Sequence, residues 1–366
     1  MSASGPPRQL IVLAVILGIA ARLITASSGD NFDMESWWIA SEAVLRNEPV
    51  YAATHRYNYG PTWSFIIGGI RWLSAATGPD TVTRLHLFMT TFLTLADLFL
   101  AWTLARTVSW SAALLFFLNP ISCFVTGYHI QFDNLAIAFG IASWLAFTGS
   151  RSTAMLLVAG ALMGVSLSMK HIFSLFIAWL PFASQVRTLK ERIIYGALAL
   201  AIFFGSFLPW AREPAVRGSI ARNVFAYTST EGHSLTGALA SLCNAPARPA
   251  FILLIIATGA LLLRARALHR FAPHLYLIAL PALSSGMARN YLAIPIFGLC
   301  TFLWAPAGPL YLVVASLAFI CTNESLGVRE VAIDLIPGTF VNYEICQGLL
   351  LLTLAQVYRR GRASTP

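Results

Sequence analysis

The chain has 366 residues and a formal net charge of +9; 57% of its residues are hydrophobic and 11% are charged. Soluble domains carry about 25% charged residues, and a water-soluble fold of this composition would expose large apolar patches and aggregate. These values exclude an ordinary soluble protein. We expect an all-α, polytopic membrane protein that forms a single integral membrane domain over residues 1–366.

Apolar stretches long enough to cross a bilayer as helices recur along the whole chain. A span needs roughly 17–25 apolar residues, and this criterion predicts about twelve transmembrane helices, within a range of roughly 10–13. The predicted spans are 9–26, 82–105, 109–127, 133–149, 153–169, 172–186, 193–210, 248–265, 271–286, 290–304, 307–321 and 341–357.

The basic residues predict the orientation, because cytoplasmic loops of membrane proteins are enriched in Lys and Arg. With both termini in the cytoplasm, the cytoplasmic side receives one acid, Glu191, and a large basic set: Arg8, Arg106, Arg151, Arg187, Lys190, Arg192, Arg264, Arg266, Arg270, Arg359, Arg360 and Arg362. The net positive charge is therefore a positive-inside bias, and it does not indicate nucleic-acid binding.

This orientation leaves two long extracytoplasmic segments, 27–81 and 211–247. Long ordered loops in compact proteins often carry function. Within the first segment, residues 64–73 are too few to cross the bilayer and return. They predict a helix that lies in the membrane interface, with Trp63 and Trp72 at the level of the headgroups.

Three acidic residues follow the first span in the sequence GDNFDMES: Asp30, Asp33 and Glu35. One interpretation is helix capping, with Asp30 as the N-cap and Asp33 three residues later. The other is catalysis, because a carboxylate at the outer membrane boundary can accept a proton from a substrate hydroxyl. Both interpretations stay open for Asp33; in the catalytic one, Asp30 and Glu35 are supporting acids, and Glu35 is alternatively a solvated side chain.

A second polar cluster lies between the third and fourth spans, in GYHIQFDN: His129, Gln131, Asp133 and Asn134. Asp133 or Asn134 as the next N-cap would explain part of it as an ordinary turn. A turn requires neither His129 nor Gln131. Polar groups at membrane depth are costly and tend to be functional, so these two residues are candidates for a binding site.

Basic residues at the outer ends of helices predict a phosphate site. Lys170 and His171 end the fifth span, and further arginines are expected on the same side: Arg217, Arg222 and Arg289. A snorkelling lysine is the alternative for Lys170. Several cations near a His at one face favour an anionic headgroup.

Two further features concern structure more than chemistry. Asp97 is a lone carboxylate inside the second span, and we expect it to tie helices together. Of the five cysteines, Cys321 and Cys346 flank one predicted outer loop and are candidates for a disulfide, and no CxxC pair indicates a metal site.

The order of these motifs resembles a known family. The motifs are, in chain order, Asp33-Met34-Glu35, Tyr57-Asn58-Tyr59-Gly60-Pro61, His129-Ile130-Gln131-Phe132-Asp133 and Lys170-His171. This order is similar to the pattern of the endoplasmic-reticulum glucosyltransferases that extend the lipid-linked oligosaccharide from dolichyl-phosphate-glucose, and of their bacterial relatives. These enzymes belong to the GT-C class of polytopic glycosyltransferases. The resemblance covers residues 29–220, and the later His-Glu-Lys segment of the family is replaced by Ala288-Arg289-Asn290.

The resemblance implies a GT-C-like fold and an inverting transfer of a hexose from a polyprenyl-phosphate-sugar donor. The acceptor is a hydroxyl of a glycan, a lipid-linked sugar or a protein. Asp33 is then the base, and cations stabilise the leaving phosphate in a poorly hydrated site. The donor and phosphate residues are His129, Gln131, Lys170, His171, Arg217, Arg222 and Arg289, and the sugar or acceptor contacts are Tyr57, Tyr59, Trp63 and Asp133. The donor carries no diphosphate, so we expect no cofactor and no metal ion.

Two other function classes remain open. A transporter or flippase of a lipid-linked sugar would share the hydrophobicity, although the polar groups here are gathered at one face and transporters bind at the bilayer midplane. A non-catalytic component of an envelope assembly would not require Asp33. The short cytoplasmic loops favour a bacterial inner membrane, with the active site extracytoplasmic.

Overall fold

The computed structural model describes residues 6–29, 31–226, 234–243, 246–321 and 339–363, and within these ranges it is helical and contains no β-strand. The N-terminal half contains α1 (Arg8–Ser27), α2 (Phe32–Leu45), α3 (Val50–Ala53), α4 (Pro61–Ala76), α5 (Val82–Thr107), α6 (Trp110–Phe117), α7 (Pro120–Gly127), α8 (Asp133–Gly149) and α9 (Thr153–Met169). The all-α class is thereby confirmed for the described residues.

The second half alternates α-helices with short helices of other types. It contains η1 (His171–Phe173), η2 (Leu175–Phe182), α10 (Leu189–Ser206), α11 (Pro214–Ile220), η3 (Ala221–Phe225), α12 (Leu235–Leu242), α13 (Ala247–Leu262), η4 (Arg266–Phe271), α14 (Ala272–Leu283), η5 (Arg289–Ala293), α15 (Ile296–Thr301), α16 (Ala307–Cys321) and α18 (Thr339–Ala363).

Several apolar helices are compatible with a membrane protein, and the count of about twelve spans is not confirmed. Among the described helices, α1 and α5 are each long and apolar enough to cross a bilayer. Two bent pairs, α6 with α7 and α12 with α13, raise this number to four if each pair is one span. These numbers rest on length and composition alone.

The predicted span 109–127 is bent by 47° between α6 and α7. Pro120 has no backbone N–H to donate, so a helix cannot continue through it undisturbed. The Asn119 side chain instead accepts a hydrogen bond from the Ile121 N–H at 3.0 Å and begins α7 as its N-cap. The predicted span 172–186 also differs from expectation, because the chain there forms the 3₁₀ helices η1 and η2, with Pro181 inside η2.

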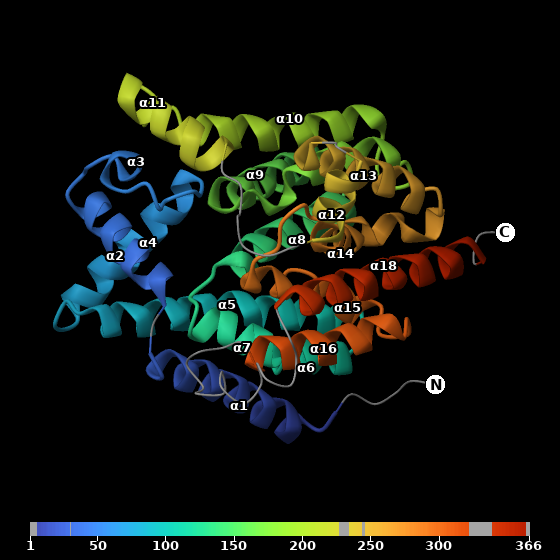
Figure 1. The fold of residues 1–366 in the computed structure, drawn as a ribbon, viewed down its shortest axis with the longest axis horizontal. Helices are drawn as coiled ribbons and strands as arrows, with labels where there is room; N and C mark the ends of the chain where they lie inside the picture. Colours follow the sequence, from blue (N-terminus) through green and yellow to red (C-terminus); the bar gives the residue numbers. More distant parts are fainter. Residues whose placement is uncertain (1–5, 30, 227–233, 244–245, 322–338, 364–366) are drawn as a thin grey trace.

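The long helices lie roughly along one direction, and α2, α3 and α4 gather at one end of the bundle (Figure 1). We call this group the outer layer. The predicted first extracytoplasmic segment, 27–81, thus contains three helices, and both α3 and α4 pack on α2. Helix α1 starts and helix α18 ends toward the opposite end of the bundle (Figure 1).

Helix α4 contains the predicted interfacial segment 64–73. One side packs on the core through Trp63 and Ile67, while the other exposes Phe65 and Trp72. Arg71 anchors the helix, since its guanidinium binds Asp80 at 2.9 Å and lies 3.6 Å from the centroid of the Trp38 ring of α2. An apolar outward face on a short helix is the arrangement expected of a helix that lies in a membrane interface.

Helices α1 and α7 approach each other closely at Gly127. A Cβ at this position would lie 2.0 Å from Thr25 Oγ1 and 2.5 Å from the Arg22 carbonyl oxygen. Glycine therefore allows the two backbones to pack directly, as small residues do between membrane helices.

The disulfide considered between Cys321 and Cys346 is not formed, because Cys346 has a free, buried thiol. The side chain of Cys321 lies outside the described part of the structure.

Candidate functional site

The first part of the candidate site is the start of α2. Asn31 is the N-cap, and its Oδ1 accepts a hydrogen bond from the Asp33 backbone N–H at 3.0 Å. The helix is capped by a side chain, as the capping interpretation expected, but the N-cap is Asn31 and not Asp30. Asp30 itself lies outside the described residues. Capping by Asn31 leaves the Asp33 carboxylate available for other contacts, and Asp33 is half-buried.

The second part is the turn between α7 and α8. The backbone N–H groups of His129 and Gln131 bind the carbonyl oxygens of Phe124 and Val125 at 3.0 and 2.9 Å, which closes α7. Between them, Ile130 has φ = +49°. A β-branched residue in this left-handed region costs of order 1–3 kcal/mol, and such strain is concentrated at functional sites.

A continuous chain of hydrogen bonds joins these two parts to the end of α9. Asp33 Oδ2 accepts from Gln131 Nε2 at 2.6 Å and from Asn31 Nδ2 at 3.3 Å. Gln131 Oε1 accepts from Lys170 Nζ at 3.2 Å, and Lys170 Nζ also donates to Asp133 Oδ2 at 2.7 Å. The Gln131 amide therefore has a fixed orientation, because its donor end meets a carboxylate and its acceptor end meets an ammonium.

The same reasoning assigns the hydrogen-bonding role of His129 Nδ1 in this arrangement. Asn31 Oδ1 faces a backbone N–H, so Asn31 Nδ2, which lies 2.8 Å from His129 Nδ1, must be a donor. His129 Nδ1 is then an acceptor, and the ring proton is on Nε2. His129 Nδ1 thus contributes a hydrogen-bond acceptor to the cluster.

Lys170 is a buried cation with a matched buried anion. Its side chain is 9% exposed and that of Asp133 is fully buried. The Lys170 ammonium also lies 5.3 and 5.2 Å from the ring centroids of Tyr59 and Phe132, within the range of cation–π attraction. Asp133 Oδ1 is buried and has no hydrogen-bond partner among the described residues, so one carboxylate oxygen of the pair remains to receive a donor.

The loop before α4 presents Tyr59 to Lys170. Gly60 N–H binds the Met169 carbonyl oxygen at 3.2 Å, and a Cβ on Gly60 would lie 2.0 Å from the Ser168 carbonyl oxygen. Thr62 Oγ1 lies 2.7 Å from Ser168 Oγ. The outer layer is thus attached to the last turn of α9 at the point where Lys170 emerges.

Aromatic rings surround this attachment. Trp63 stacks on Phe132 with a centroid distance of 4.1 Å, and Trp37 packs edge-on against both Tyr57 and Trp63. Tyr57 and Trp63 are fully buried in the cluster, whereas Tyr59 is half-buried. Tyr59 is therefore better placed than the other two to contact a bound molecule.

A second buried network lies beneath the first. Asp97 of α5 accepts from Arg22 Nε at 2.7 Å, from Thr126 Oγ1 at 2.8 Å and from Asn134 Nδ2 at 2.6 Å. Arg22 and Asp97 are fully buried. The network joins α1, α5, α7 and α8, as the lone carboxylate in the second span led us to expect.

These contacts overturn the capping interpretation of Asp133 and Asn134. The N-cap of α8 is Phe132, without a side-chain bond, and Asp133 is the first helical residue. Asp133 binds Lys170 and Asn134 binds Asp97. A charged partner for each of these side chains outweighs the single hydrogen bond that a cap would provide.

Several predicted site residues lie outside the hydrogen-bonded chain. Glu35 is exposed and pairs with Arg56 at 2.5 Å. Arg217 and Arg222 are exposed on and after α11. The backbone of Arg289 begins η5, and its side chain is outside the described part of the structure.

His171 follows Lys170 directly but differs from it in charge. Burial of the ring, with Lys170 and Arg248 nearby, lowers the pKa of His171 to about 4. His171 is therefore neutral at pH 7 and cannot act as a fixed cation.

Sequence reasoning missed Asn31, Arg22 and the strained Ile130. An arginine inside an apolar helix was the available signal for Arg22, since a charge at membrane depth needs a partner. Nothing in the sequence marks Ile130, because isoleucine rarely adopts a positive φ.

Among the described residues, no group of three or more His, Cys, Asp or Glu side chains is placed to hold a metal ion. No protein-family model matches the chain, and no curated protein matches its sequence. The assignment of a function therefore rests on the geometry and on the motif resemblance.

Proposed function

We propose that the protein is a GT-C-like membrane glycosyltransferase that moves a hexose from a polyprenyl-phosphate-sugar donor to an acceptor hydroxyl on the extracytoplasmic face of a bacterial inner membrane. The observation that carries the proposal is the hydrogen-bonded chain Asp33–Gln131–Lys170–Asp133. Three motifs that are widely separated in the sequence, and that carry the family resemblance, meet in it.

The burial of the carboxylates favours Asp33 as the base. Asp97 and Asp133 are fully buried and each faces a buried cation, and Glu35 is exposed and paired with Arg56. Asp33 is half-buried and is held by two amide donors. A general base must be both oriented and reachable by its substrate, and Asp33 combines these properties.

The proposed reaction is a single displacement. The acceptor hydroxyl gives its proton to Asp33 as its oxygen bonds to the anomeric carbon, and the bond from that carbon to the phosphate oxygen breaks. The lipid phosphate leaves with the bonding electrons, so the anomeric configuration inverts. Lys170 has one N–H beyond those used by Asp133 and Gln131, and this donor supports the charge that develops on the phosphate.

The test is transfer by the full chain in membranes supplied with radiolabelled polyprenyl-phosphate-glucose or polyprenyl-phosphate-mannose. Asp33→Asn is expected to lower transfer by about 10²–10⁴-fold. Glu35→Gln, two residues later on the same helix, is the matched control and is expected to stay within about threefold, because solvent screens its exposed ion pair. A loss of transfer supports the base assignment if both variants unfold at the wild-type midpoint. Wild-type transfer by Asp33→Asn would refute the base assignment.

A transporter or flippase of a lipid-linked sugar is the second candidate. It is favoured by the buried Arg22–Asp97 pair, because charges at membrane depth often mark transport pathways. Movement of labelled lipid-linked sugar across sealed vesicles without a glycosidic product would support this candidate and exclude the transferase. A non-catalytic assembly component predicts neither activity.

A further inference from the structure

The segment that follows α10 carries three arginines at its surface. Arg212, Arg217 and Arg222 are exposed, and none of them makes an ion pair within the described part of the chain. Glu213 is the acid in this segment and is exposed as well. The segment therefore presents uncompensated positive charge.

The positive-inside bias does not account for this charge. Helix α11 packs on α3 of the outer layer, at the end of the bundle opposite the start of α1 (Figure 1). Under the predicted orientation this end is extracytoplasmic, where basic residues are not enriched. The arginines at this end therefore need an explanation other than the orientation of the chain in the membrane.

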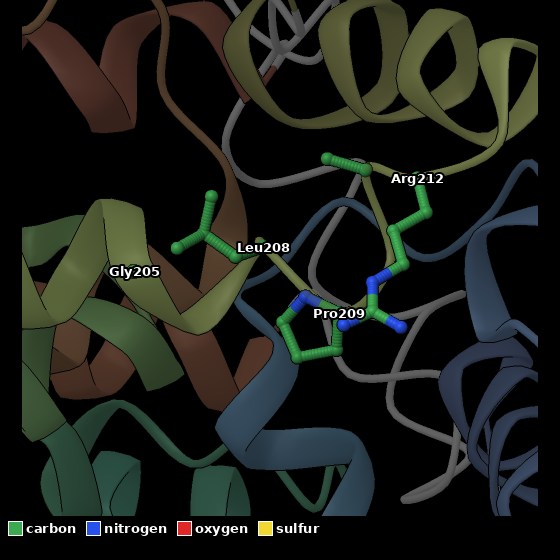
Figure 2. Close-up of a pocket in the computed structure, with 5 residues that line it drawn as sticks. Gly205, Leu208, Pro209 and Arg212 are labelled. Atoms are coloured by element: carbon green, nitrogen blue, oxygen red, sulfur yellow. The ribbon is translucent and has the colours of Figure 1, made fainter.

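Two pockets open beside these arginines. The first has a volume of about 510 Å³ and is lined by Gly205, Leu208, Pro209, Ala211 and Arg212. Figure 2 shows the Arg212 guanidinium turned back toward the Pro209 ring. The second has a volume of about 180 Å³ and is lined by Phe204, Phe207, Ala211, Arg217, Ile220, Ala221 and Phe225. Ala211 lines both pockets, so they adjoin, and each has one arginine in its wall.

Exposed apolar side chains lie beside the arginines around the pockets. Leu208 is 68% exposed and Phe204 is 55% exposed at the end of α10. The buried face of α11 and η3 consists of Val216, Ile220 and Val224, which leaves Arg217 and Arg222 outward. Arg222 lies over Gly218, since its Nη1 is 3.4 Å from where a Gly218 Cβ would be. Exposed large apolar side chains beside arginines match an acyl chain beside a phosphate.

We propose that this surface, formed by Phe204, Leu208, Arg212, Arg217 and Arg222, binds the headgroup of an anionic phospholipid of the surrounding bilayer. The arginines contact the phosphate and an acyl chain lies along Phe204 and Leu208. A zwitterionic headgroup fits less well, because its ammonium group would meet three guanidinium groups and one carboxylate. The proposal requires that the chain is embedded in a membrane and does not depend on the transfer reaction.

The test measures lipid selectivity with the full chain in detergent–lipid micelles. Spin-labelled phosphatidylglycerol and phosphatidylcholine report how many lipids of each kind are held by the protein. The wild-type protein is expected to prefer phosphatidylglycerol. Each arginine near an anionic surface contributes about 1 kcal/mol, or about fivefold in affinity, so Arg212→Ala/Arg217→Ala is expected to lose most of that preference.

The matched control is Arg46→Ala. Arg46 is exposed at the end of α2, in the outer layer, but it is paired with Glu42 at 2.5 Å. Its removal is expected to leave the preference unchanged. An equal loss in Arg46→Ala, or an unchanged preference in the double variant, would overturn the proposal.

Competition separates this lipid from other phosphates. Displacement of phosphatidylglycerol by millimolar inorganic phosphate would mean that the site takes a soluble anion, which overturns the lipid assignment. Displacement by a trace of polyprenyl phosphate would mean that the arginines serve the donor, which also overturns it. Asp33→Asn is expected to lose transfer and keep the lipid preference, so the two proposals fail separately.

Discussion

The buried pair of Arg22 and Asp97 gives a sharp prediction about stability. Both side chains are fully buried and their charged atoms are 2.7 Å apart. Removal of one partner of such a pair costs about 3–5 kcal/mol, because the other charge is left uncompensated in a medium of low polarity. Asp97→Asn retains the shape of the side chain and is expected to destabilise the protein by this amount.

The double variant Arg22→Met/Asp97→Asn is expected to be more stable than Asp97→Asn alone. It removes the isolated guanidinium, although the Phe117 carbonyl oxygen loses its 3.0 Å bond from Arg22 Nη1. A buried acceptor without its donor costs about 1–3 kcal/mol. The coupling energy between the two sites is therefore expected to exceed about 2 kcal/mol.

Reversible unfolding in mixed micelles, followed by tryptophan fluorescence, measures Arg22→Met, Asp97→Asn and the double variant against the wild type. The cycle is valid when all four proteins unfold in one transition. Additive effects, with a double variant as unstable as the sum of its parts, would refute the view that the pair is stabilised as a unit.

Three further predictions concern the site. Gly60→Ala, just before α4, places a Cβ 2.0 Å from the Ser168 carbonyl oxygen and is expected to cost about 1–3 kcal/mol of stability by overpacking. Gly69→Ala, within α4, meets open space and is expected to be neutral or stabilising by up to about 1 kcal/mol. Unfolding midpoints compare the two variants. Asn31→Ser is expected to keep the helix cap but to lose the bond to His129, so transfer should fall while the unfolding midpoint stays near that of the wild type. The pKa of His171 is lowered to about 4 in the folded protein, so the unfolded chain binds the proton first and stability should decline as the pH falls from about 6.5 to about 4. His171→Gln should therefore show a smaller decline in thermal midpoint between pH 7 and pH 5. An unchanged decline in this variant would contradict the assignment of the pH effect to His171.

Sequence patterns were sufficient to bring the main site residues together. The acidic motif after the first span, HIQFD and the lysine after the fifth span were expected at one face, and Asp33, Gln131 and Lys170 are hydrogen-bonded. This worked because each motif directly precedes or follows a helix, and the ends of neighbouring antiparallel helices meet at one side of a bundle. The resemblance supplied the roles of the residues, which composition and spacing do not contain.

The sequence was insufficient where one residue has several candidate partners. Capping and ion pairing compete for Asp133, and tertiary contact with Lys170 decided the outcome. Arg217 and Arg222 are of a residue type that often binds phosphate, yet they lie exposed on α11 and η3, outside the hydrogen-bonded chain. Distance from a site depends on tertiary packing, which local patterns do not specify.

The adjacent residues Asp133 and Asn134 have a mechanical consequence. Successive side chains of an α-helix point about 100° apart, and these two are held by partners on different helices, Lys170 after α9 and Asp97 on α5. Rotation of α8 about its axis would break one bond or the other, so its outer end acts as a fixed pivot. The outer layer contacts the turn before α8 through the Gln131–Asp33 bond and the packing of Trp63 on Phe132, so we expect any movement that admits a bound molecule to occur in the outer layer.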